Sequence, residues 1–170
     1  MRDAAPPPRV VVMGVSAAGK SSVGVDLARL AGVRFIDADD LHPPGNVAKM
    51  ASGTPLEDDD RWPWLDEVAA ALAEAEGAVV ACSALKRSYR DRLRAAAPGA
   101  VFVHLTGSTA LLAERAGGRG GHFMPPALLR SQLDTLESLG LDETGIEIDV
   151  DAPVAQIAQT ALEWMDARAR

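Results

Sequence analysis

The chain has 170 residues, of which 48% are hydrophobic and 24% are charged, a composition typical of one globular domain that excludes a disordered or fibrous protein. Lys and Arg number 17 against 24 Asp and Glu, and this net charge of −7 argues against a dedicated nucleic-acid binder. A single cysteine excludes a disulfide framework, and no apolar run approaches the roughly 20 residues that a membrane span needs.

The elements expected along the chain alternate between strands and helices. Five short apolar runs are typical of buried strands: Val10–Met13, Val33–Ile36, Ala78–Ala81, Val101–Leu105 and Ile146–Val150. Helical spacing follows at Ser21–Ala31, Asn46–Ala51, Trp62–Ala75, Lys86–Ala96, Ser108–Ala116, Pro125–Leu139 and Pro153–Ala167. This alternation predicts a three-layer α/β/α fold with about five parallel strands. We expect a disordered tail over residues 1–8, one domain over residues 9–170, and a cytoplasmic protein.

The first strand leads into a phosphate-loop pattern, G-x-x-x-x-G-K-[ST], spanning Gly14 to Ser21. Gly14 and Gly19 let the backbone bend so that successive N–H groups point at phosphate oxygens, and the helix behind them adds its positive end. Lys20 can reach the β- and γ-phosphates, while the Ser21 hydroxyl is placed to bind Mg²⁺. An ordinary glycine turn is the alternative. The pattern predicts an ATP and Mg²⁺ site built from Gly14, Ser16, Ala17, Ala18, Gly19, Lys20, Ser21 and Ser22.

The surroundings of this loop indicate the class of reaction. The chain lacks the guanine-reading N-K-x-D of regulatory GTPases. Its third strand runs into Cys82-Ser83, without the acidic residue that motor and transport ATPases carry there. Carboxylates follow the second strand instead, at Asp37, Asp39 and Asp40. An acidic pocket beside the γ-phosphate suits a small-molecule kinase, in which a carboxylate orients the acceptor hydroxyl.

Further motifs make the chain resemble the bacterial gluconate kinases. They are Asp37-Ala38-Asp39-Asp40-Leu41-His42-Pro43, Lys49-Met50-Ala51-Ser52-Gly53, Asp58-Asp59-Asp60-Arg61, Cys82-Ser83-Ala84-Leu85-Lys86 and Gly121-His122-Phe123-Met124. The resemblance runs from Val11 to about Val154 and implies a fold similar to shikimate and nucleoside monophosphate kinases. It also implies transfer of the ATP γ-phosphate to the 6-hydroxyl of D-gluconate by an enzyme that is commonly a homodimer.

The resemblance, combined with the chemistry, implies roles at the reacting end of the site. Asp39 would orient the acceptor hydroxyl and take its proton, next to Lys20. Asp37 would face the metal together with Ser21. At the nucleotide's other end, the segment from Asp151 to Pro153 would border the adenine, so that Asp151 and Pro153 belong to the ATP site.

The same resemblance implies a pocket for a sugar acid. Arg61 and Lys86 are both candidates for the gluconate carboxylate, Arg61 having the fork that matches it bidentately. The substrate hydroxyls would bond to His42, Asn46, Lys49, His122 and Gln132, although His42 could equally be a packed structural imidazole. The three lysines of the chain, Lys20, Lys49 and Lys86, all fall in segments expected to face ligands.

A mobile lid is expected over about residues 116–126, where glycines surround arginine. Arg115 and Arg119 are spaced i, i+4 and would meet the phosphates on closure, Arg119 as a catalytic group. An ordinary glycine loop is the alternative. Three positions depart from the family's pattern: Ala17 replaces a usual glycine, Gly120 a frequent lysine, and Ser138 a common proline.

Two other functions remain open from the residues alone. A kinase for another small acid, such as shikimate, would share the phosphate loop and the D-x-D pattern, but shikimate kinases lack the segments 58–61 and 82–86 as a set. A non-catalytic nucleotide-binding protein would be expected to lack the acceptor-site carboxylates or the lid arginines, which this chain has.

Overall fold

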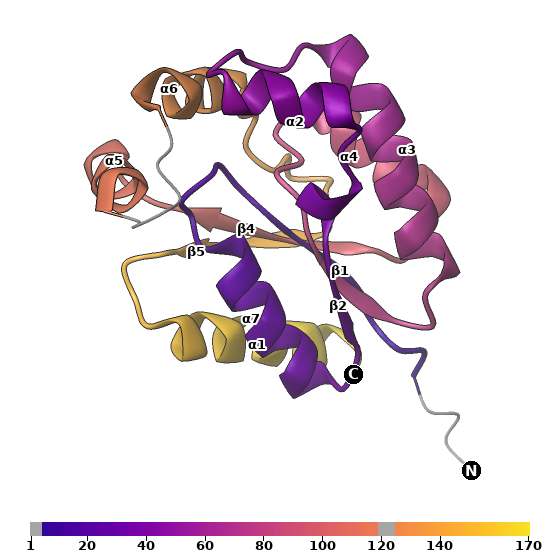
Figure 1. The fold of residues 1–170 in the computed structure, drawn as a ribbon. Coiled ribbons are helices and arrows are strands. Elements are labelled where there is room, and N and C mark those ends of the chain that lie inside the picture. Colours follow the sequence, from indigo (N-terminus) through magenta and orange to yellow (C-terminus); the bar gives the residue numbers. More distant parts are fainter. Residues whose placement is uncertain (1–4, 119–124) are drawn as a thin grey trace.

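A five-stranded parallel sheet organises the protein, seen in a computed structural model that describes residues 5–118 and 125–170 (Figure 1). Its strands are β1 (Arg9–Met13), β2 (Arg34–Asp37), β3 (Ala78–Ala81), β4 (Val101–Thr106) and β5 (Gly145–Asp149), in the order β2-β3-β1-β4-β5. Strand β1 pairs in parallel with β3 on one side and with β4 on the other. The predicted α/β fold is confirmed.

Helices cover both faces of this sheet. Helices α1 (Lys20–Ala31) and α7 (Val154–Arg168) pack together below it in Figure 1, and α3 (Asp58–Glu74) and α4 (Arg87–Ala96) pack together on the opposite side. The central strands are therefore apolar on both faces, and Val10, Val11 and Val12 are fully buried. The structure also has the short helix η1 (Ala38–Leu41) and the helices α2 (Pro44–Ala51), α5 (Thr109–Gly118) and α6 (Pro126–Thr135).

Two helix boundaries differ from the prediction by more than two residues, and one short helix was not predicted. Helix α3 begins at Asp58 rather than at Trp62, because Glu57 and Asp60 form a capping box at its start. Helix α6 ends at Thr135 rather than near Leu139, because the chain turns extended and the Glu137 amide donates to the carbonyl of Leu85 at 2.8 Å. Helix η1 was not predicted; the Asp37 carboxylate caps it by accepting a hydrogen bond from the Asp39 amide.

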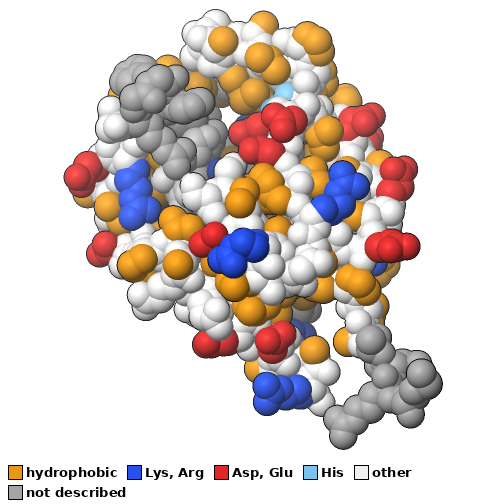
Figure 2. Space-filling model, turned by 60° about the horizontal axis from the view of Figure 1, so that its bottom comes forward, with side chains coloured by type: hydrophobic (Ala, Val, Ile, Leu, Met, Phe, Trp, Pro, Cys, Tyr) orange, Lys and Arg blue, Asp and Glu red, His pale blue; other side chains and the backbone are white. Residues whose placement is uncertain are grey.

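The N-terminal end of the described chain lies against the sheet. Residues 1–4 of the expected tail lie outside the described residues, and the carbonyl of Pro8 already accepts a hydrogen bond from the Ala78 amide. On the face shown in Figure 2, the described Lys and Arg side chains stand apart from one another among acidic and apolar ones. Within residues 5–118 and 125–170, no helix is both long and apolar enough to cross a membrane.

Candidate active site

The phosphate loop joins β1 to α1 at the carboxyl edge of the sheet. Gly14 and Gly19 have φ angles of 145° and 88°, a region that favours glycine. A Cβ on Gly14 would also lie 2.8 Å from the carbonyl oxygen of Leu105, so a larger residue cannot fit there. The Lys20 ammonium donates to the carbonyl of Val15 at 3.0 Å, which folds the lysine back over the loop. The backbone thus has the bent form that the motif predicts.

Ala17 stands in the same loop with a φ of 69°, and it is buried. A residue with a Cβ in this left-handed conformation is strained by about 1–2 kcal/mol. The resemblance to gluconate kinases implies glycine at this position, and the chain forms the loop with alanine there at a local cost in backbone energy. Ala18, also buried, and Ser22, in the first turn of α1, complete the predicted nucleotide-binding segment.

Ser21 and Asp37 meet directly in front of this loop. The Ser21 hydroxyl donates to Asp37 Oδ2 at 2.9 Å, which brings the start of α1 to the end of β2. Hydroxyl and carboxylate oxygens are the ligands that Mg²⁺ prefers, and the ion commonly takes only one or two carboxylates besides substrate phosphates and water. The two residues therefore fit a Mg²⁺ ion whose remaining ligands a bound nucleotide and water would supply.

Asp39 lies next to this pair, on η1. Desolvation raises its pKa, Lys20 lowers it, and the carboxylates of Asp37 and Asp40 raise it further, leaving it above its ordinary value. The side chain is still 78% exposed, so solvent screening limits this shift. Asp39 is consequently a solvent-accessible carboxylate, as a proton acceptor for a bound hydroxyl must be.

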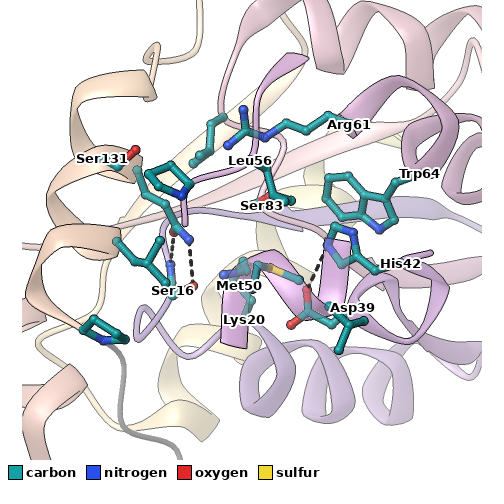
Figure 3. A pocket seen from close by; sticks show the side chains of 16 residues that line it. Ser16, Lys20, Asp39, His42, Met50, Leu56, Arg61, Trp64, Ser83 and Ser131 are labelled. Atoms are coloured by element: carbon teal, nitrogen blue, oxygen red, sulfur yellow. Dashed lines mark hydrogen bonds and ion pairs between the residues drawn. The ribbon is translucent and has the colours of Figure 1, made fainter. Parts of the chain in front are cut away.

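A cavity of about 420 Å³ opens beside these groups (Figure 3). Lys20 and Asp39 lie at one end of it, and Arg61, from the first turn of α3, lies at the other. The walls come from the phosphate loop, α2, α3, α6 and the segment after β3. They include Ser16, His42, Met50, Leu56, Trp64, Ser83, Leu85, Ser131 and Gln132.

His42 is both packed and directed at this cavity. Its ring stacks on Trp64 with centroids 4.1 Å apart and planes 13° from parallel. Burial, and secondarily the charge of Arg61, lowers the pKa of His42 to about 4, so the imidazole is neutral at physiological pH. Its Nε2 atom lies 3.9 Å from Asp39 Oδ1. The two readings of His42 in the sequence are therefore compatible in one side chain.

The three cations predicted to bind the substrate, Lys49, Lys86 and Arg61, differ in their hydrogen-bond partners. Lys49 donates to both carboxylate oxygens of Asp60, at 2.9 and 2.8 Å, and Lys86 donates to both oxygens of Asp58, at 3.1 and 3.2 Å. Arg61 is buried, and the only hydrogen bond of its guanidinium among the described residues runs to the Tyr89 hydroxyl at 3.1 Å. Within the described parts of the chain, Arg61 is thus a cavity-lining cation without a carboxylate partner.

Gln132 reaches the phosphate loop from α6. Its side-chain oxygen accepts from the Ser16 amide at 2.7 Å, and its side-chain nitrogen donates to the Ser16 hydroxyl at 3.1 Å. Both ends of this amide are therefore engaged with the loop, although Gln132 also lines the cavity as predicted for a substrate contact. The bond joins two segments that are 116 residues apart in the chain.

A second hollow lies on the other side of the phosphate loop. It is lined by Ala17, Ala18, Gly19, Ser22, Arg115, Ala152 and Val154, among others. Arg115 donates to the carbonyl of Val150 at 2.8 Å, and this contact holds α5 beside the segment that carries Asp151 and Pro153. Pro153 caps the start of α7, and the Asp151 amide donates to Asp149 Oδ1 at 2.8 Å. Ala152 and Val154, the chain neighbours of the predicted Asp151 and Pro153, line this hollow, whereas Asp151 and Pro153 are not among its lining residues.

Comparison with known proteins identifies the family. The sequence model of shikimate kinase matches residues 16–139. The chain is 50% identical over 143 residues to the gluconokinase of Gluconobacter oxydans, covering 82% of this chain and 80% of that one. It superposes on the crystal structure of a gluconokinase from Sinorhizobium meliloti with a TM-score of 0.91 and 51% identity, covering 98% and 95%. The chain belongs to the gluconokinase family.

The match to the shikimate kinase model agrees with membership of the gluconokinase family, because this chain shares the fold of a shikimate kinase. The shikimate kinase of Aquifex aeolicus shares 16% identity over 95% of this chain and 98% of its own, with a TM-score of 0.58, which shows a common fold alone. The predicted resemblance to gluconate kinases, drawn from motifs outside the phosphate loop, is confirmed. The likeness expected to shikimate kinases in fold is confirmed as well.

Some parts of this gluconokinase site were missed from the sequence, and some lie outside the described residues. Tyr89, Asp58 and Asp60 were not assigned roles, yet they bind the predicted cations: Asp58 accepts from Lys86, Asp60 from Lys49, and Tyr89 from Arg61. Tyr89 also donates a short hydrogen bond to Asp58 Oδ1. The available signal was that Asp58 and Asp60 lie in the acidic motif over residues 58–61, and that Tyr89 follows the motif over residues 82–86 by three residues. Arg119, His122 and most of the expected lid lie outside the described residues.

Proposed function

We propose that this protein transfers the γ-phosphoryl group of ATP to the 6-hydroxyl of D-gluconate, producing 6-phospho-D-gluconate and ADP. One observation carries the proposal: a single cavity has the phosphate-loop lysine and an accessible carboxylate, Asp39, at one end and Arg61 at the other. A phosphoryl acceptor that is itself an anion needs this polarity. Relatives named gluconokinase, 40–50% identical to this chain, support the same substrate.

In the proposed reaction Asp39 accepts the proton of the 6-hydroxyl as its oxygen bonds to the γ-phosphorus. The bond between that phosphorus and the β,γ-bridging oxygen breaks, and ADP leaves with the bonding electron pair. The ammonium of Lys20 and the N–H groups of the loop stabilise negative charge on the phosphates. Mg²⁺, held by Ser21 and Asp37, would neutralise further phosphate charge when bound.

At the far end of the cavity, Arg61 would bind the gluconate carboxylate. Lys86 was the other candidate, but its ammonium is already shared between both oxygens of Asp58. Among the described residues the Arg61 guanidinium forms no ion pair and interacts with the carboxylates of Asp58 and Asp60 only at longer range, so it gains more from a substrate carboxylate than an ammonium that is already paired. The planar fork also suits bidentate contact.

The proposal also covers the predicted lid, the other predicted substrate contacts, the oligomeric state and the cellular compartment. Arg119 would stabilise the transferring phosphoryl group and Arg115 the nucleotide, with His122, Lys49 and Gln132 around the substrate. Residues 116–126 would close as a lid and exclude water. We propose a cytoplasmic homodimer, which light scattering and fractionation would test.

The test is a coupled assay of ADP release from ATP and Mg²⁺, run with and without acceptors. D-gluconate, its epimers, shikimate and no acceptor form the panel. Release that depends on gluconate supports the proposal, while release with shikimate alone would favour the other small-acid kinase. If no acceptor supports release although ATP binds, the protein is a nucleotide-binding module and the proposal is wrong.

A further inference from the structure

His42 is held behind the reacting end of the cavity by a chain of hydrogen bonds from α2. The Asn46 side-chain nitrogen lies 3.2 Å from His42 Nδ1, and the same nitrogen donates to the backbone carbonyl of Asp60 at 2.9 Å. Asn46 is 5% exposed and the His42 side chain 4% exposed, so water does not readily replace these partners. Trp64, stacked on the ring, is itself fixed by donating to the Ala38 carbonyl at 2.7 Å.

This chain of contacts determines which ring nitrogen of His42 carries the proton. The Asp60 carbonyl can only accept, so the amide group of Asn46 that faces it must be the NH₂ and not the oxygen. An NH₂ group offers donors alone, and its second hydrogen points at His42 Nδ1. Nδ1 must therefore accept and bear no hydrogen. Since the ring is neutral, the hydrogen is on Nε2, the atom that faces Asp39.

We propose that His42 binds the oxygen of the reacting hydroxyl as an obligate Nε2–H donor, and that Asn46 is the positioning residue that enforces this tautomer. The inference rests on the proposed function for the identity of the acceptor. It gives Asn46 a role behind the site, and it makes His42 a specificity-determining contact at the atom that reacts.

The geometry allows one hydroxyl to satisfy both neighbours. His42 Nε2 and Asp39 Oδ1 are 3.9 Å apart, too far for a direct hydrogen bond. An oxygen placed about 2.8 Å from each can accept from Nε2–H and donate its own hydrogen to the carboxylate. The lone pair that remains is then free to attack phosphorus. The charged groups near the ring are Asp39 in front of it and Arg61, whose charge disfavours protonation of the ring.

Two substitutions at position 42 separate donation from packing. His42→Phe keeps an aromatic ring to stack on Trp64 but has no donor, whereas His42→Gln lacks the ring and keeps an N–H donor near the place of Nε2. We expect His42→Phe to lower kcat/KM for gluconate about tenfold to a hundredfold, and His42→Gln to retain more activity. The reverse order, with both variants folded by circular dichroism, would show that the ring serves packing only and would overturn the proposal.

A spectroscopic measurement on the free protein tests the tautomer without any substrate. In ¹⁵N-detected long-range NMR spectra of uniformly labelled protein between pH 6 and 8, His42 should show a protonated Nε2 and a bare Nδ1. Asn46→Leu, of similar volume, should abolish that preference and lower kcat/KM. A wild-type Nδ1–H tautomer or an imidazolium would refute the inference even if gluconate is turned over. Failure of the gluconate assay with the expected NMR pattern would refute the proposed function instead.

Discussion

Replacing Arg61 by methionine tests whether one guanidinium selects the substrate. Methionine keeps most of the side-chain volume and removes the charge. A charge-assisted hydrogen bond contributes about 1.5–3 kcal/mol, so losing the contact with a carboxylate should lower kcat/KM for gluconate by about tenfold to 150-fold. The hydrogen bond from Arg61 to Tyr89 at 3.1 Å is lost too, at about 1 kcal/mol of stability, which thermal unfolding would report.

The informative readout is a ratio of two acceptors. D-glucitol has a hydroxymethyl group where gluconate has its carboxylate, so the ratio of kcat/KM for gluconate to that for glucitol isolates the carboxylate contact. Arg61→Met should collapse this ratio, and Arg61→Lys should restore part of it. Lys86→Met is the matched control, because Lys86 is paired with Asp58, and its ratio should stay near that of the wild type. An unchanged ratio in Arg61→Met, or a collapse in Lys86→Met, would refute the assignment.

Three further predictions concern the reacting carboxylate, the loop and the core. Asp39→Asn should abolish turnover but leave ATP binding, measured by calorimetry, intact; substantial residual turnover would exclude Asp39 as the proton acceptor. In the wild type, kcat/KM should fall on acidification with an apparent pKa above 3.8. Ala17→Gly should raise the melting temperature slightly, because relief of about 1–2 kcal/mol of strain exceeds the roughly 0.5–1 kcal/mol entropic cost of glycine; a lower value would contradict the strain. Burial raises the pKa of Glu143, but bonds from Arg90, the Gly140 amide and Arg94 bring it from 4.5 to about 2. Its contribution of about 3 kcal/mol is therefore present above pH 4.5 and lost as the pH falls towards 2, so urea unfolding of Glu143→Gln should depend less on acid pH than that of the wild type.

Local patterns in the chain were sufficient for the fold and for the bent backbone of the phosphate loop. Buried parallel strands are continuous apolar runs, and the phosphate loop is a contiguous motif whose glycines, lysine and serine are set by backbone geometry within eight residues. Asp37 and Asp39 were predictable for the same reason, because they follow a strand directly. The starts of α3 and η1 were missed because both depend on side-chain caps, which compete closely with other turns.

The assignment of partners needed the folded chain. Lys86 and Asp58 are 28 residues apart, and Ser16 and Gln132 are 116 apart, so their pairing follows from the packing of α3, α4 and α6 around the sheet. The sequence left both Arg61 and Lys86 as candidates for the substrate carboxylate and assigned Lys49 to the substrate hydroxyls. The tertiary structure separates them, because a cation already neutralised by a carboxylate gains little from a second one, and among the described residues Arg61 faces the cavity without such a partner.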